Sequence, residues 1–275
     1  MTRIKSILMM AGLALPLTIA PTYTAMAFDG ATQAQTEKTN AAPFQPTENV
    51  MADVDAMLAR ASAQGKLGLI VMGGNWCHDS LALATRMGTP ELAPILETNY
   101  ETMLVDVAGL SDNMDVARRF GRPVIYGTPT VLIIDPATQQ LVNAHDMHQW
   151  RDAESISMAD STAYFTKMAT AATRGVPQEA AMAPHYAKMM ADIDAFEEAQ
   201  AKRIYGGFAV VGPMVMMKNG ERPENFRSLW VELSKFRYQI TKDLTALKAE
   251  VRSFAAEGNN SAVLAYPNYT PFSWE

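Results

Sequence analysis

The chain has 275 residues, of which 48% are hydrophobic, 19% charged and 8% aromatic. This is ordinary usage for a globular protein and excludes a mostly disordered or collagen-like chain. The formal net charge is -6, so the chain lacks the basic surface that nucleic-acid binding needs. It has one cysteine, and a single thiol excludes an internal disulfide.

The first 27 residues have the pattern of an export signal. Arg3 and Lys5 precede an apolar run over 7–20, and Ala25-Met26-Ala27 supplies the small residues of a cleavage site. The apolar run is shorter than the ~20 residues that a membrane span needs. The sequence therefore predicts a signal peptide over 1–27 and a periplasmic or secreted protein with no membrane span after cleavage; a retained anchor is the alternative.

Residues 28–49 are rich in Ala, Thr, Gln and Pro and show no apolar period, so they predict a flexible linker. Over 50–173, short apolar runs alternate with apolar residues at helical spacing, which is typical of a small α/β domain. The expected strands cover 67–72, 102–107 and 130–134, with an antiparallel neighbour over 140–144, and the expected helices cover 50–63, 81–87, 114–120 and 155–172.

Residues 174–258 contain no convincing strand. Apolar residues recur every three or four positions on both sides of a turn over 219–223, which predicts two long helices folded back as an antiparallel hairpin. Gly206-Gly207 and Pro213 predict a bend or break in the first of these helices. The aromatic tail over 259–275 either packs back on the hairpin or contacts a partner.

The single thiol, Cys77, lies where a predicted strand ends and a predicted helix begins. Free N–H groups and the helix dipole at such a helix start favour a thiolate. Ser80 follows about one helical turn later and could donate a hydrogen bond to the thiolate. His78 would help if protonated, whereas the negative charge of Asp79 acts against the thiolate. With Trp76 before it, we expect this thiol at the protein surface; a buried, inert cysteine is the alternative.

Trp76-Cys77-His78-Asp79-Ser80 resembles the Trp-Cys-x-x-Cys motif of the thioredoxin family, with Ser80 in place of the second cysteine. Gly127-Thr128-Pro129-Thr130 matches the cis-proline segment that faces the active-site thiol in that family. The resemblance covers 50–173 and implies a thioredoxin-like α/β domain, with a central mixed sheet flanked by helices, followed here by the helical hairpin. Val71 stands where the family often has a buried acid. Without that acid and a second cysteine, the chain cannot resolve a mixed disulfide by itself.

The resemblance implies an exported monothiol thiol–disulfide oxidoreductase or isomerase that forms mixed disulfides. Release would need an external thiol, on a protein or a small molecule. The implied partners are therefore protein or low-molecular-weight thiols and disulfides, and no cofactor is implied. The implied site consists of Cys77 as the nucleophile, Ser80 as a donor to its thiolate, Trp76 and His78 beside it, and Thr128 and Pro129 as the substrate-binding edge.

Two other functions stay open. The domain could keep the fold without the chemistry and serve as a redox-inactive interaction module, with a protein partner on the hairpin. His145-Asp146-Met147-His148, in a chain with 19 Met, could also bind copper. Copper-handling proteins of the thioredoxin-like class usually pair two cysteines with a histidine, however, so we predict no metal site.

Overall fold

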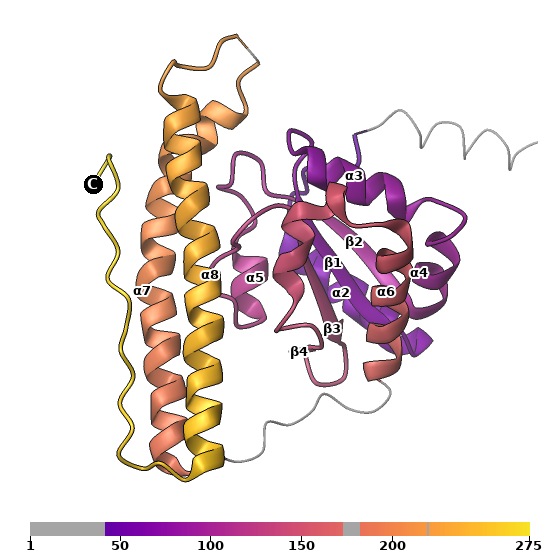
Figure 1. The fold of residues 1–275 in the computed structure, drawn as a ribbon. Coiled ribbons are helices and arrows are strands. Elements are labelled where there is room, and N and C mark those ends of the chain that lie inside the picture. Colours follow the sequence, from indigo (N-terminus) through magenta and orange to yellow (C-terminus); the bar gives the residue numbers. More distant parts are fainter. Residues whose placement is uncertain (1–41, 173–181, 219) are drawn as a thin grey trace, which may run out of the picture. The chain divides into compact units, whose positions relative to one another are not determined.

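A four-stranded mixed sheet carries the residues that lead into Cys77 (Figure 1). Its strands lie in the order β2-β1-β3-β4. Parallel pairing joins β1 to β2 and antiparallel pairing joins β1 to β3 and β3 to β4. The strands are β1 (Leu67–Gly73), β2 (Tyr100–Asp106), β3 (Thr130–Asp135) and β4 (Gln140–Leu141).

Every residue of β1 is buried, because helices cover both faces of this sheet. Ile70 and Met72 face one core, which includes apolar residues of α2 and α5, and Leu69 and Val71 face a second core with residues of α3, α4 and α6. The helices are α2 (Val50–Gln64), α3 (His78–Met87), α4 (Ala93–Asn99), α5 (Asp115–Arg119), the 3₁₀ segment η2 (Met147–Ser155) and α6 (Met158–Ala172). This arrangement is a thioredoxin-like fold, as the sequence predicts.

The structure, a computed structural model, describes residues 42–172, 182–218 and 220–275. The predicted signal peptide over 1–27 lies outside these residues, as does the linker up to residue 41. Near its end the linker prediction is wrong, because Phe44 is 1% exposed. Its backbone exchanges two hydrogen bonds with the side chain of Asn75, at 3.1 and 2.6 Å, which fixes this segment beside the loop before Cys77.

Two helices of 32 residues each, α7 (Pro184–Val215) and α8 (Phe226–Glu257), form the predicted helical hairpin. Of the predicted bend or break in the first helix, the break is wrong, because α7 runs through Gly206-Gly207 and has Pro213 in its last turn. One glycine of this helix is explained by contact: a Cβ on Gly207 would lie 2.6 Å from a methyl group of Leu233 on α8. Within the described residues, no helix is long and apolar enough to cross a membrane.

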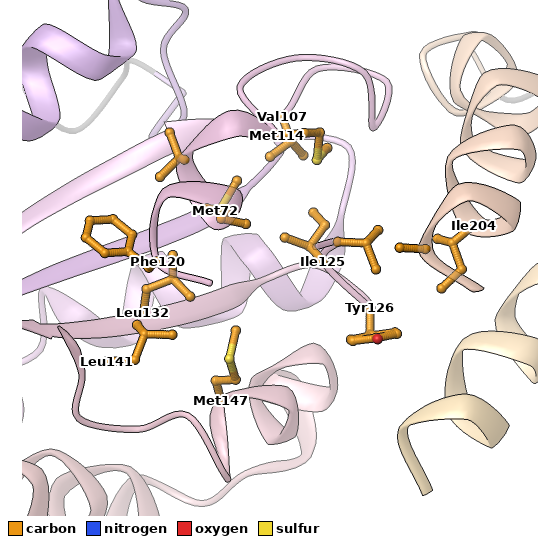
Figure 2. Packing of buried hydrophobic residues seen from close by; sticks show 14 of the residues in the cluster. Met72, Val107, Met114, Phe120, Ile125, Tyr126, Leu132, Leu141, Met147 and Ile204 are labelled. Atoms are coloured by element: carbon orange, nitrogen blue, oxygen red, sulfur yellow. The ribbon is translucent and has the colours of Figure 1, made fainter. Parts of the chain in front are cut away.

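One hydrophobic core joins the α/β part to the hairpin (Figure 2). Ile125 and Tyr126, which precede β3, face Ile204 of α7 in Figure 2, and all three are buried. The hydroxyl of Tyr126 donates a hydrogen bond to the buried carboxylate of Glu197 on α7, at 2.9 Å. Residues from Ala42 onward accordingly form one compact unit.

The aromatic tail packs back on the hairpin. Phe272 is buried and stacks on Trp274 with ring centroids 4.4 Å apart. Arg203 of α7 forms an ion pair with Glu275 at 3.0 Å, and the hydroxyl of Tyr269 donates to Asp243 of α8 at 2.8 Å. Of the two alternatives for the tail, the structure shows the intramolecular one.

The strand predicted over 140–144 is shorter than expected, since β4 ends at Leu141. The side chain of Asn143 takes over the pairing with β3. Its Oδ1 accepts from the N–H of Ile133, and its Nδ2 donates to the carbonyl of Val131, both at 2.9 Å. A buried amide thus satisfies backbone groups that a longer strand would have paired.

Candidate functional site

Cys77 is the N-cap residue of α3, in the turn that follows β1. Its N–H donates to the carbonyl of Gly74 and its own carbonyl accepts from the N–H of Leu81, both at 3.1 Å. The helix begins at His78 because these two bonds close the turn and then the first helical turn. The predicted placement of the thiol at a helix start is confirmed.

The sulfur of Cys77 faces the loop before β3. Its Sγ donates to the carbonyl oxygen of Thr128 at 3.2 Å. The Thr128–Pro129 peptide bond is cis, as the resemblance implies. Cys77 is a free thiol and is 7% exposed, so the expectation of a surface thiol is wrong. Side chains of α8, among them Trp230 and Arg237, line the same cleft as the sulfur, which the local sequence around the motif does not indicate.

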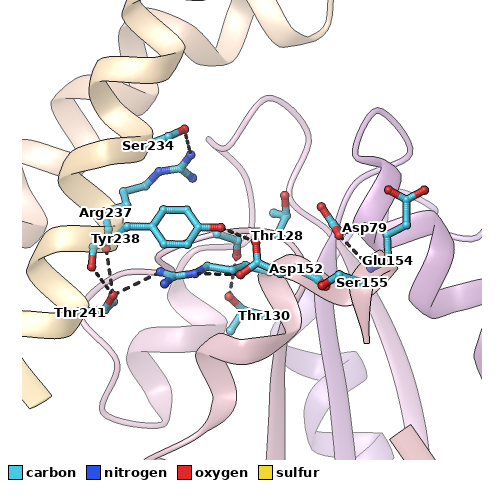
Figure 3. A network of polar contacts seen from close by, with 12 residues as sticks. Asp79, Thr128, Thr130, Asp152, Glu154, Ser155, Ser234, Arg237, Tyr238 and Thr241 are labelled. Atoms are coloured by element: carbon cyan, nitrogen blue, oxygen red, sulfur yellow. Dashed lines mark hydrogen bonds and ion pairs between the residues drawn. The ribbon is translucent and has the colours of Figure 1, made fainter. Parts of the chain in front are cut away.

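The thiol opens onto a cleft of about 400 Å³ between the motif, the 126–128 loop, η2 and α8. A cleft of this size suits a small molecule. Figure 3 shows several of its polar residues, including Tyr238 and Arg237 from α8. Its lining includes Trp76, Cys77, Thr128, Arg151, Trp230 and Arg237.

Trp76 forms one wall of this cleft. Its indole N–H donates to the carbonyl of Ala108 at 2.6 Å. The ring lies edge-on to Trp230 of α8, with centroids 6.1 Å apart. The predicted position of Trp76 beside the thiol is therefore observed, and its indole is held by a loop on one side and by the hairpin on the other.

His78 and Ser80 lie near the thiol but make other contacts. The imidazole Nε2 of His78 lies 3.0 Å from a carboxylate oxygen of Asp79 and 3.6 Å from one of Glu154. Ser80 is fully buried and its hydroxyl accepts the N–H of Gly74 at 3.4 Å. That bond ties α3 to the end of β1. The hydrogen bond from Ser80 to the sulfur that the sequence suggests is not among those formed by the described residues.

Two arginines place positive charge at the cleft. Arg237 of α8 is 5% exposed, and burial, followed by the like charge of Arg151, lowers its pKa from 12.5 to about 10. Negative charge on Tyr238 or Cys77 acts in the opposite direction. Burial also lowers the pKa of Arg151, whose guanidinium lies 3.5 Å from the centre of the Tyr238 ring. A thiolate at Cys77 and the Arg237 guanidinium therefore attract each other.

Sequence reasoning missed this contribution of the hairpin. Arg237 lies between Leu233 and Ile240 on the apolar stripe of α8, and all three are buried. A charged residue on the buried face of an amphipathic helix is unusual, since an unpaired cation is rarely buried. An arginine on the apolar stripe of a predicted helix is visible in the sequence, and it could have identified Arg237 as a candidate site residue.

The segment considered for copper directs its side chains to different partners. Asp146 accepts the hydroxyl of Tyr164 at 2.8 Å, Met147 is in the core, and the ring of His148 packs edge-on against Tyr126. In the part of the chain that the structure describes, no group of three or more His, Cys, Asp or Glu side chains is arranged to hold a metal ion.

No protein-family model matches the chain, and no curated protein matches it. Among solved structures, the chain is similar to a disulphide isomerase from Xylella fastidiosa Temecula1, with 21% sequence identity and a TM-score of 0.44. The match covers 47% of this chain and 98% of that chain. The thioredoxin-like fold is established here by the strand order, the pairing directions and the helices on both faces of the sheet.

Proposed function

We propose that Cys77 carries out monothiol thiol–disulfide exchange with disulfides that enter the cleft under α8. One observation supports this most directly: the sulfur lies at the helix start, lines the cleft and has a backbone carbonyl at 3.2 Å beside it. The helix N-terminus and Arg237 both favour negative charge at that position.

The exchange has two balanced steps. The Cys77 thiolate attacks one sulfur of a disulfide, a Cys77–S–S–R bond forms, and the other half leaves as a thiolate. An external thiolate then attacks the R sulfur, forms a new disulfide with it and returns Cys77 as a thiolate. The external thiol is required because the chain contains one cysteine.

Mass spectrometry of the folded protein with bis(2-hydroxyethyl) disulfide, a small uncharged probe, tests the proposal. We expect one adduct per chain, no adduct on Cys77→Ser, and release of the adduct by added glutathione. The unfolded chain serves as the control for thiol reactivity. If the unfolded chain reacts and the folded protein does not, the exchange proposal is wrong.

A redox-inactive interaction module is the second candidate, and the 7% exposure of Cys77 favours it. In that case the hairpin would bind a protein partner and the α/β part would support it. The same experiment separates the two, because a module of this kind needs no adduct.

We also propose that the protein is exported and loses residues 1–27. The charged start, apolar run and small-residue site support this proposal. Determination of the N-terminus of the protein isolated from its host would test it: a chain that begins at Phe28 supports cleavage, and one that begins at Met1 contradicts it.

A further inference from the structure

Arg237 is a buried cation that lacks an anion. Its Nη2 donates to the hydroxyl of Ser234 at 3.0 Å (Figure 3), and its Nε is buried without a hydrogen-bond partner. The guanidinium lies 5.0 Å from the centre of the Trp230 ring. None of the ion pairs formed by the described residues includes it. Burial of an unpaired charge is costly, so a group from outside the chain is the natural partner.

A second guanidinium adds to the positive charge. Arg151 also lines the cleft, and its Nε is buried without a hydrogen-bond partner. Its Nη1 donates to the hydroxyl of Thr241 at 3.3 Å, and the nearest carboxylate oxygen of Asp152 is 3.8 Å from its Nε. Asp152 also accepts the hydroxyl of Tyr238, so its charge is shared between two donors.

The other charged groups at the cleft already have protein partners. Asp79 accepts the N–H of Glu154 at 2.9 Å and pairs with His78. Arg222 donates to the carbonyls of Met214 and Val215 at the end of α7, at 3.2 and 3.0 Å. Arg237 is therefore the cleft cation with the fewest partners among the described residues.

We infer that Arg237, supported by Arg151, binds the carboxylate of a small anionic disulfide or thiol and holds its sulfur near Cys77. This inference rests on the exchange reaction proposed above and names its substrate class. Two features favour a small substrate over a polypeptide: the cleft has a volume of about 400 Å³, and side chains of α8, including Trp230 and Tyr238, form one of its walls. The carboxylate stays bound while the mixed disulfide forms, because no bond to it changes.

Three small disulfides that differ in charge test the inference: dithiodipropionate with two carboxylates, bis(2-hydroxyethyl) disulfide with none, and cystamine with two ammonium groups. The measurement is the rate of mixed-disulfide formation on the full chain at low ionic strength. We expect dithiodipropionate to react about tenfold faster than the uncharged probe, since a charge-assisted hydrogen bond is about twice as strong as a neutral one. Cystamine should be the slowest.

Variants separate binding of the carboxylate from activation of the thiol. In Arg237→Gln, a weaker thiolate would slow all three probes equally, whereas loss of the carboxylate site removes the preference for dithiodipropionate. Arg237→Lys should restore part of the preference. Arg227→Gln is the matched control, because Arg227 lies on the same helix and is exposed; it should keep the full preference.

The possible failures are distinguishable. If no probe reacts with the folded protein, the proposed function is wrong. If all three react at equal rates, or if a disulfide in an unfolded protein reacts faster than dithiodipropionate, the exchange stands and the anionic substrate class is wrong. Should Arg237→Gln fail to fold, the wild-type charge preference and its loss at high salt still decide the matter.

Discussion

Replacement of Arg237 by methionine should stabilise the folded protein. The Arg237 guanidinium lies 5.6 Å from the centre of the Phe208 ring and 5.0 Å from that of Trp230. Methionine keeps an unbranched apolar stem at this position and removes the buried charge. The fall in the pKa of Arg237 from 12.5 to about 10 corresponds to a cost of about 3 kcal/mol, at about 1.4 kcal/mol per pH unit. Loss of the Ser234 hydrogen bond and the aromatic contacts offsets part of this gain, so the expected increase in unfolding free energy is about 1–3 kcal/mol.

The sign follows from proton binding. At pH 7 the guanidinium is protonated in both the folded and unfolded states, so the full cost is present. Between pH 10 and 12.5 the folded state releases its proton first, so wild-type stability rises with pH there relative to the variant. Guanidinium chloride denaturation followed by circular dichroism measures the difference at pH 7. Arg227→Met, at an exposed position of the same helix, is the control and should change stability by less than about 0.5 kcal/mol.

A variant that is less stable than the wild type by more than about 1 kcal/mol, with an unchanged control, would refute this reasoning. It would mean that contacts within the chain already compensate the Arg237 charge. Arg237 would then need no external anion.

Two further predictions concern other parts of the fold. Burial, followed by the charge of Arg151, lowers the pKa of His148 from 6.5 to about 3. Below pH 6.5 the unfolded state therefore binds a proton that the folded state does not, and the free energy of unfolding falls as the pH falls. At pH 5, about 1.5 units below the unfolded-state pKa, this loss reaches at most about 2 kcal/mol. His148→Gln should flatten the pH dependence of unfolding, whereas His145→Gln, at an exposed position, should not. Parallel curves for all three proteins would contradict the assignment. A Cβ on Gly212 would lie 1.9 Å from the carbonyl oxygen of Gly109, so Gly212→Ala should destabilise the protein by about 1–3 kcal/mol or more. Gly206→Ala, on the same helix with nothing within 4 Å of the added carbon, should instead stabilise the protein by up to about 1 kcal/mol. Similar midpoints of denaturation for the two variants would show that the close approach of Gly212 to Gly109 does not restrict the side chain at position 212.

Patterns within short stretches predicted most of the α/β part. The end of β1 was predicted to within a residue, and the turn after it places Cys77 near a helix start; the helix itself begins at His78, three residues before the predicted position 81. The short α4 and η2 were missed. A seven-residue helix such as α4 (Ala93–Asn99) carries less than two turns of apolar period, and η2 has the three-residue repeat of a 3₁₀ helix.

Features that depend on distant residues were not predictable in the same way. Phe44 is hydrogen-bonded to Asn75, which lies 31 positions away in the chain, and the residues next to Phe44 in the sequence have the composition of a linker. Part of the lining of the cleft at Cys77 comes from Trp230 and Arg237, far along the chain. The helix stripes indicated that a hairpin forms, but they did not indicate which of its side chains would line the cleft.

The approach of Gly109 to Gly212 has a consequence for the cleft. The neighbouring residue Ala108 supplies the carbonyl that holds the indole of Trp76, and Gly212 belongs to α7. Backbone atoms of Gly109 and Gly212 approach each other directly, so no flexible side chain lies between them that could adjust if α7 shifted. The wall next to the thiol is thus positioned by a segment more than a hundred residues away, so the α/β half separated from its helices would not keep the same cleft.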